Sequence, residues 1–109
     1  MNRLAIASIL VLGFASVCAL ASDGDAVIGK TKATPCFACH GQDGKGIAPI
    51  YPVLAGQHPD YLAHALSQYR SGERKNAIMA GFAGQLSDDD IADLAAWFGS
   101  LEGLITAQR

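Results

Sequence analysis

Two cysteines and a histidine lie close together in the segment Cys36-Phe37-Ala38-Cys39-His40. The pattern Cys-x-x-Cys-His is typical of c-type haem attachment. Two thiols at this spacing can add to the two vinyl groups of one porphyrin, because the two residues between them let the backbone turn. The adjacent imidazole of His40 can then bind the iron. The motif therefore predicts one covalently bound haem c, attached through Cys36 and Cys39, with His40 as the proximal iron ligand.

Other chemistry is open to the same three side chains. A structural zinc ion normally needs four Cys or His ligands, so it would also require His58 or His64. A thioredoxin-like dithiol needs a strand and a helix around it. A simple disulfide is the ordinary state of two cysteines in an exported protein. The disulfide interpretation leaves His40 without a role, whereas the haem interpretation uses all three residues.

The amino-terminal stretch has the form of a secretory signal. Arg3 is followed by an apolar run and then by Ala19-Leu20-Ala21, the small-x-small pattern that signal peptidases recognise. We expect cleavage after Ala21, which leaves residues 22–109 as one domain exported to the periplasm. An uncleaved membrane anchor is the alternative, because the run could almost span a bilayer core of about 30 Å. Export agrees with the haem motif, since c-type haem is attached on the export side of the membrane.

Removing residues 1–21 changes the composition. Of these residues 16 are apolar, against 39 of the remaining 88, or about 44%, which is ordinary for a soluble domain. The remaining domain has a net charge of about −3, which argues against a nucleic acid partner. Cys18 leaves with this segment, and the bulky Val17 before it disfavours a lipoprotein anchor. A domain of 88 residues has a small core, which a prosthetic group would stabilise.

The elements that position the motif are expected to be helices joined by loops. A first helix is predicted over about residues 25–34, ahead of Pro35, which disfavours helical geometry in the residue before it. Residues 41–56 are rich in glycine and proline, and we predict a loop there. No segment alternates convincingly at period two, so we predict an all-α domain.

Two longer helices are predicted after this loop. One begins at Pro59, which suits a first helical turn, and ends at Gly72. Its apolar stripe consists of Leu62, Ala65, Leu66 and Tyr69. The other is capped by Ser87 and has acidic residues in its first turn, where the helix dipole favours them. Its apolar face consists of Ile91, Leu94, Ala95, Phe98 and Leu101.

Several ordered segments resemble the class I cytochromes c, in particular small bacterial periplasmic members whose domains also occur in tandem dihaem forms. The segments are residues 36–41, 51–57, 69–74, 76–81, 86–88 and 94–98. They cover most of the domain, and they imply the cytochrome c fold, with three main helices and loops wrapped around one haem. The chain contains a single haem motif, so one haem is expected.

The resemblance also implies further site residues. Met79 would be the distal iron ligand, on a glycine-containing loop between the second and third helices. Its thioether is a soft, neutral donor that favours ferrous iron, although a lone methionine is otherwise typical of core filling. The ring N–H of His40 would donate to the carbonyl of Pro52, with Pro49 as the alternative in another register. Leu54 would contact the haem.

Other residues are assigned structural or surface roles. Gly29 and Trp97 resemble the family's crossing contact between the terminal helices, where glycine permits close approach of the backbones. His64 is expected on the exposed side of its helix, and His58 at the entrance of the same helix. Cations near the haem motif and before Met79 could steer an acidic partner: Lys30, Lys32, Lys45, Arg70, Arg74 and Lys75.

The resemblance implies a periplasmic electron carrier and not an enzyme. Its partners would be redox proteins that donate and accept single electrons, with no organic substrate, and it would be a monomer or a weak dimer. One alternative is a haem c subunit of a periplasmic dehydrogenase or oxidase complex. Another is a small haem peroxidase, which needs an open position at the iron that Met79 would close.

Overall fold

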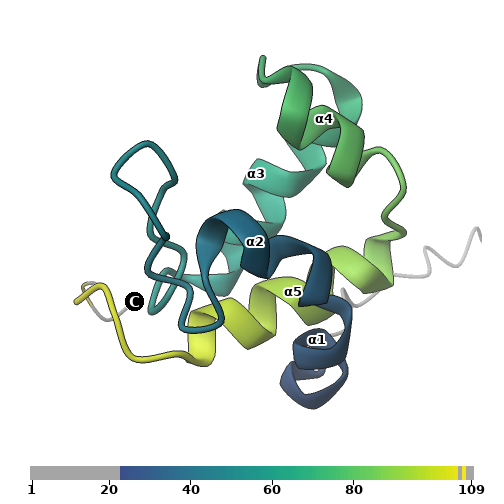
Figure 1. The fold of residues 1–109 in the computed structure, drawn as a ribbon. Helices are drawn as coiled ribbons and strands as arrows, with labels where there is room; N and C mark the ends of the chain where they lie inside the picture. Colours follow the sequence, from purple (N-terminus) through teal and green to yellow (C-terminus); the bar gives the residue numbers. More distant parts are fainter. Residues whose placement is uncertain (1–22, 106, 108–109) are drawn as a thin grey trace, which may run out of the picture.

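The computed structural model describes residues 23–105 and 107. The predicted signal segment and its cleavage site lie outside these residues. The described part is helical and contains no strand, which confirms the all-α prediction (Figure 1). Its elements are α1 (Ala26–Lys32), the 3₁₀ turn η1 (Thr34–Cys36), α2 (Phe37–His40), α3 (Pro59–Ser71), α4 (Ala77–Ala83) and α5 (Asp88–Ser100). None of the described helices has the length and apolar character needed to cross a membrane.

The segment that leads to the two cysteines differs from its prediction. Helix α1 begins as expected, because the side chain of Asp25 accepts hydrogen bonds from the backbone N–H groups of Val27 and Ile28. It ends before Pro35, as expected, but already at Lys32, and the chain then continues through Pro35 in the turn η1, which was not predicted. Proline fits there because the first N–H groups of a helical turn have no partner within the turn. The chain therefore passes from α1 into α2 with little intervening loop.

Helix α5 lies at the centre of the fold and packs against both α1 and α3 (Figure 1). Its start is fixed by reciprocal hydrogen bonds, in which Ser87 Oγ accepts from Asp90 N at 3.1 Å and Asp90 Oδ2 accepts from Ser87 N at 3.0 Å. The predicted cap is thus confirmed. The apolar face of α5 contributes its buried residues Ile91, Leu94, Ala95 and Phe98.

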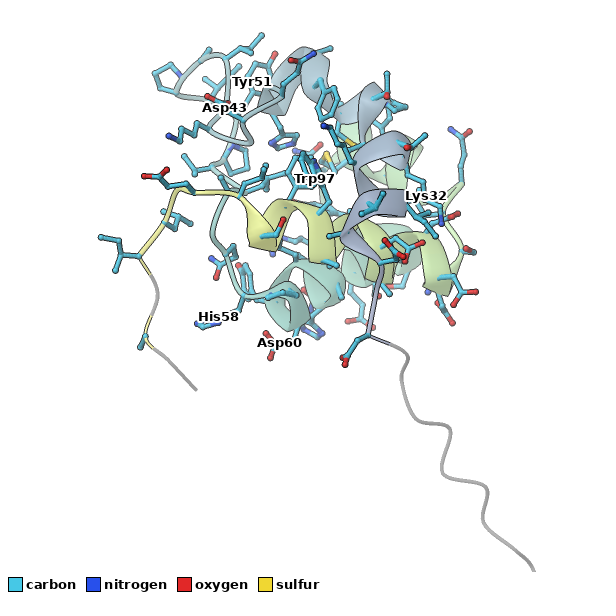
Figure 2. All side chains as sticks on the ribbon, turned by 90° about the horizontal axis from the view of Figure 1, so that it is seen from below. Lys32, Asp43, Tyr51, His58, Asp60 and Trp97 are labelled. Carbon is cyan, nitrogen blue, oxygen red and sulfur yellow. The ribbon has the colours of Figure 1, made fainter. Side chains whose placement is uncertain are left out.

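The crossing of α1 and α5 depends on glycine and on one lysine. A Cβ atom at Gly29 would collide with the carbonyl oxygen of Asp93 and would lie 2.9 Å from the Cβ atom of Trp97, so the predicted contact between Gly29 and Trp97 is confirmed. Beside it, Lys32 Nζ lies 2.8 Å from Asp90 Oδ1 and 2.6 Å from Asp93 Oδ2. These ion pairs join α1 to α5. Figure 2 shows the position of Lys32.

The loop between α2 and α3 is folded back onto α2. Its first residues are held by hydrogen bonds from Gly46 N to His40 O (2.7 Å) and from Ile47 N to Cys39 O (3.0 Å). The carbonyl of Gly44 then accepts from both Leu54 N and Ala55 N. Gly44 has φ +70°, and a side chain there would press on Ala55. The expected loop is confirmed, and its closure brings residues 51–54 beside α2.

Helix α3 agrees with its prediction, since it begins at Pro59 and ends before Gly72, which has φ +84°. The segment after Gly72 differs from its prediction. Met79 was expected on a loop, but it lies in the first turn of α4. The side chain of Asn76 supplies the cap that starts this helix, and the following residues Ala77 to Ala83 contain no proline. Among the described helices, α4 packs against α3 alone.

Candidate functional site

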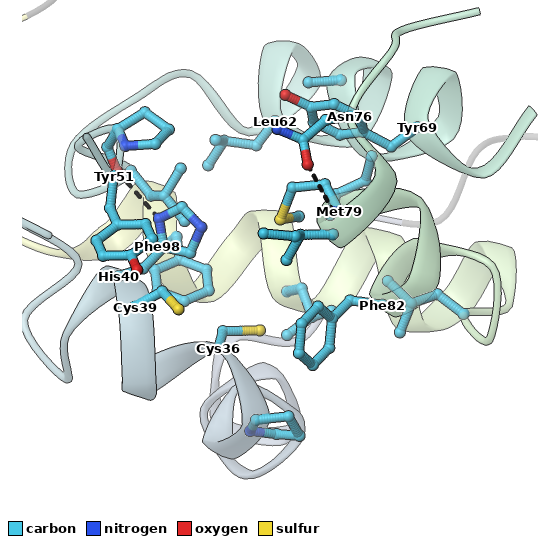
Figure 3. Close-up of a pocket in the computed structure, with 18 of the residues that line it drawn as sticks. Cys36, Cys39, His40, Tyr51, Leu62, Tyr69, Asn76, Met79, Phe82 and Phe98 are labelled. Atoms are coloured by element: carbon cyan, nitrogen blue, oxygen red, sulfur yellow. Dashed lines mark hydrogen bonds between the residues drawn. The ribbon is translucent and has the colours of Figure 1, made fainter. Parts of the chain in front are cut away.

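A cavity of about 540 Å³ lies between the helices, within the range of about 300–1,000 Å³ that is typical of ligand sites. One wall comes from η1, α2 and the following loop, with Cys36, Cys39 and His40. The opposite wall comes from α4 and includes Met79 (Figure 3). The floor is mostly apolar and is formed by α3 and α5: Leu62, Ala65, Leu66, Tyr69, Leu94, Ala95 and Phe98.

His40 is buried and has one polar partner. Its Nδ1 atom lies 3.0 Å from the carbonyl oxygen of Pro52. A carbonyl oxygen only accepts, so Nδ1 carries the proton and donates, and the lone pair of the neutral ring is on Nε2. The folded loop thus fixes both the tautomer and the orientation of the imidazole. An imidazole held in this way is suited to bind a metal ion through Nε2.

The two cysteines lie about one helical turn apart, Cys36 at the end of η1 and Cys39 in α2, and they are not joined in a disulfide. Burial raises the pKa of the Cys36 thiol. Tyr51 contacts the same wall, with its ring edge-on to His40 at 6.4 Å between centroids. A hydrogen bond to Cys39 raises the pKa of the Tyr51 hydroxyl. Both sulfurs belong to the lining of the cavity.

Met79 faces His40 from the other wall, and its sulfur is directed toward the space between them (Figure 3). Its backbone N–H donates to Asn76 Oδ1 at 3.0 Å. Leu54 and Pro52 also line the cavity, on the His40 side. The cavity therefore brings together all six site residues suggested by the sequence, although they come from residues 36–40, 52–54 and 79 of the chain.

These residues fit a haem group. Two unpaired thiols, one imidazole with an available nitrogen and one thioether surround an apolar space, and these are the donors found around haem iron. Among the described residues, no group of three or more His, Cys, Asp and Glu side chains is arranged to hold a metal ion, so the zinc alternative is not supported. The described part also lacks the strand that a thioredoxin-like dithiol needs.

The remaining histidines and the alternative proline lie outside the cavity. His64 is exposed on α3, and His58 occupies the cap position of that helix, as the sequence suggested. Neither residue belongs to the cavity lining, and neither does Pro49. The contact of His40 is with Pro52, not with Pro49.

Most of the cations that could steer a partner already contact groups of this chain. Lys32 pairs with Asp90 and Asp93, and Arg70 Nη2 lies 2.6 Å from Asp88 Oδ1. The remaining contacts are with aromatic rings: Lys30 with Trp97 and Arg74 with Tyr69. Of the six cations, Lys32 and Arg70 are thus paired with carboxylates of this chain, whereas the ring contacts of Lys30 and Arg74 leave their charges in place.

The lining also contains residues that the sequence argument gave no role of their own, among them Tyr51, Asn76 and Phe82. A sequence signal existed for Asn76, because asparagine directly before an apolar segment is typical of a helix cap. No local signal marks Tyr51 or Phe82, since their position depends on the fold of the loop and of α4.

Comparisons with known proteins identify a matching family model and several relatives. The family model described as cytochrome c matches residues 26–102. Cytochrome c-554(548) of Halomonas halodenitrificans is 51% identical over 82 residues, which are 72% of this chain and 99% of that protein. The crystal structure of reduced cytochrome c4 from Pseudomonas stutzeri superimposes with a TM-score of 0.70 and 41% identity, covering 75% of this chain and 48% of that one.

A third relative is named for its redox partner. The thiosulfate dehydrogenase electron acceptor of Stutzerimonas stutzeri is 38% identical over 76 residues, which are 67% of this chain and 35% of that protein. The chain thus spans nearly the whole of one relative, about half of cytochrome c4 and about a third of the acceptor.

Proposed function

The chain belongs to the cytochrome c family, and we propose that it is an exported one-electron carrier whose single haem is attached at Cys36 and Cys39 and whose iron is bound by His40 and Met79. Membership of this family means that the chain carries covalently bound haem c and acts as an electron-transfer protein, not as an enzyme. The proposal adds the identity of the ligands, the periplasmic location and the partners, which are redox proteins of the periplasm or the membrane.

One observation carries the assignment of the ligands. The imidazole of His40 and the thioether of Met79 face each other across one apolar cavity, next to two unpaired thiols (Figure 3). The hydrogen bond to Pro52 leaves Nε2 of His40 available on the cavity side of the ring. We assign to Pro52 the carbonyl that accepts the hydrogen bond from the ring N–H of His40, and to Leu54 an apolar contact with the haem.

The chain's own groups would perform three tasks. The haem, when bound, supplies reversible one-electron exchange between ferrous and ferric iron. His40 and Met79, which lie on opposite walls of the cavity, would hold the iron in both oxidation states, so that little rearrangement would accompany each transfer. Met79 raises the reduction potential relative to a second histidine, because a thioether is a soft, neutral donor. Apolar side chains such as Leu94 and Phe98 keep water away from the iron and lower the local polarity.

Absorption spectra test the closed ligand set. The oxidised protein is expected to show the weak sulfur-to-iron charge-transfer band, and the reduced protein is expected not to bind carbon monoxide. Met79→Ala should remove the band and permit carbon monoxide binding. His64→Ala is the matched control, because His64 is exposed on α3 outside the cavity. Absence of the band from the unaltered protein, together with avid carbon monoxide binding, would support a peroxidase-like open site instead.

Attachment and export need separate measurements. Haem should remain on the chain in a denaturing gel, and replacement of both Cys36 and Cys39 by alanine should abolish that signal. The mass of the exported protein should correspond to a chain that starts at Ser22 and carries one haem. A full-length mass with haem would indicate an uncleaved anchor.

A second candidate function is a permanent haem subunit of a dehydrogenase complex. It is favoured by the relative named as the electron acceptor of thiosulfate dehydrogenase. A free carrier should elute alone, as a monomer or weak dimer, from size-exclusion chromatography of a periplasmic extract. Co-elution with one enzyme at constant ratio would establish the subunit role.

A further inference from the structure

Asn76 is both the cap of the helix that carries Met79 and a residue of the cavity lining. Its backbone is extended (φ −162°, ψ 113°), and its side-chain Oδ1 accepts the hydrogen bond from Met79 N at 3.0 Å (Figure 3). This contact satisfies one of the N–H groups that lack a partner at the start of a helix. The residue that ends the loop therefore fixes the backbone of the residue whose sulfur faces His40.

Helix α4 has few other supports. It contains seven residues, and an isolated helix of that length is not stable in water. Among the described helices it packs only against α3. Only Ala83 of α4 is buried, and Ile78 and Phe82, which are 67% and 45% exposed, line the cavity together with Met79. Packing against α3 alone among the described helices leaves the hydrogen bond to Asn76 as a main contact that fixes the first turn of α4.

We propose that Asn76 is a positioning residue for Met79, and that its cap controls how often the thioether leaves the iron. The inference rests on the proposed ligation by His40 and Met79. With the cap in place, the first turn of α4 holds the sulfur toward the cavity. Without it, the turn frays and the fraction of molecules with Met79 detached increases.

Binding of free imidazole to the ferric protein measures this fraction. Imidazole can occupy the iron only when Met79 is detached, so its apparent dissociation constant is inversely proportional to the fraction of molecules with Met79 detached. Loss of an asparagine cap shifts a helix equilibrium by about 2- to 30-fold. We therefore expect Asn76→Ala to bind imidazole about 2- to 30-fold more tightly than the unaltered protein. Asn76→Ser, which retains a capping oxygen, should restore most of the original affinity.

A second cap in the same chain provides the matched control. Ser87 caps α5 through its hydrogen bond to Asp90 N, and it lies outside the cavity lining. Ser87→Ala should lower the free energy of unfolding without changing imidazole binding. The inference is overturned if Asn76→Ala binds imidazole like the unaltered protein, if Asn76→Ser matches Asn76→Ala, or if Ser87→Ala has the same effect as Asn76→Ala.

Met79→Ala separates the two proposals. It should bind imidazole more tightly than every capping variant, since no thioether then competes. If it binds imidazole no more tightly than the unaltered protein, the assignment of Met79 as ligand fails, and the inference fails with it. If Met79→Ala binds more tightly and Asn76→Ala does not, only the role of Asn76 is wrong.

Discussion

The crossing of α1 and α5 at Gly29 offers a sharp test of the fold. Replacing Gly29 by alanine would place a Cβ atom against the carbonyl of Asp93, 2.6 Å from its carbon and 2.9 Å from the Cβ of Trp97. Ordinary contacts begin at about 3.4 Å, and the carbonyl oxygen lies nearer to the added Cβ atom than the carbon, so α1 and α5 would have to separate by more than about 0.8 Å. Overpacking of this kind costs about 1–3 kcal/mol, and the higher helix propensity of alanine offsets about 0.8–1 kcal/mol. The collision involves backbone atoms that cannot rotate away, which places the cost at the upper end.

We therefore expect Gly29→Ala to lower the free energy of unfolding by about 2 kcal/mol, or Tm by about 8–16 °C. Gly81→Ala is the control, because it makes the same change within α4 where no atom lies within 4 Å of the added Cβ. It should leave stability unchanged or raise it by up to about 1 kcal/mol. Urea unfolding of the haem-loaded protein, followed by circular dichroism, measures both. Equal stability of Gly29→Ala and Gly81→Ala would refute the crossing argument.

Three further predictions concern α5 and its neighbours. Lys32 holds the pKa of Asp90 at about 2 and lowers that of Asp93, while both carboxylates raise the pKa of Lys32. The unaltered protein should thus have a higher free energy of unfolding than Lys32→Met. This difference should be full from about pH 4 to pH 10, and it should decrease toward pH 2 and above pH 10.5. A difference in urea unfolding that stays constant from pH 2 to 7 would contradict this. Leu94→Ala should cost about 2–5 kcal/mol by the same assay, since Leu94 is buried in the core, and a loss below 1 kcal/mol would disprove its core role. Trp97→Phe should lower the free energy of unfolding less than Trp97→Ala. It keeps an aromatic ring at the crossing and removes only an indole N–H that has no partner among the described residues. Equal losses of unfolding free energy in the two variants would count against this.

The sequence was most informative where chemistry and local structure coincide. The spacing of Cys36, Cys39 and His40 predicted the cofactor, and the capping residue Ser87 predicted the start of α5. Gly29 and Trp97 were paired correctly across more than sixty residues, but only through the family resemblance. Periodicity alone does not identify which residues of two helices meet.

The errors concern short elements. Helix α1 ends before Pro35 as expected, but the 3₁₀ turn that contains Pro35 and leads directly into α2 was not predicted. The resemblance placed Met79 on a glycine-containing loop, but the segment is helical, because the cap of Asn76 outweighs the low helix propensity of Gly81. A seven-residue helix gives a weak periodic signal, so its existence depends on the cap and on packing against α3.

The two sides of the cavity are supported unequally, and this bears on electron transfer. His40 is held by α2, by the folded loop and by the hydrogen bond to Pro52, and it follows directly after an attachment cysteine. Met79 lies in a short helix that packs against α3 alone among the described helices, and its backbone N–H donates one hydrogen bond to Asn76 Oδ1. Any change of iron ligation should therefore begin at Met79. Because the proposed thioether ligand would raise the reduction potential, a cap in a segment distant from the haem motif would then become a determinant of the redox properties of the protein.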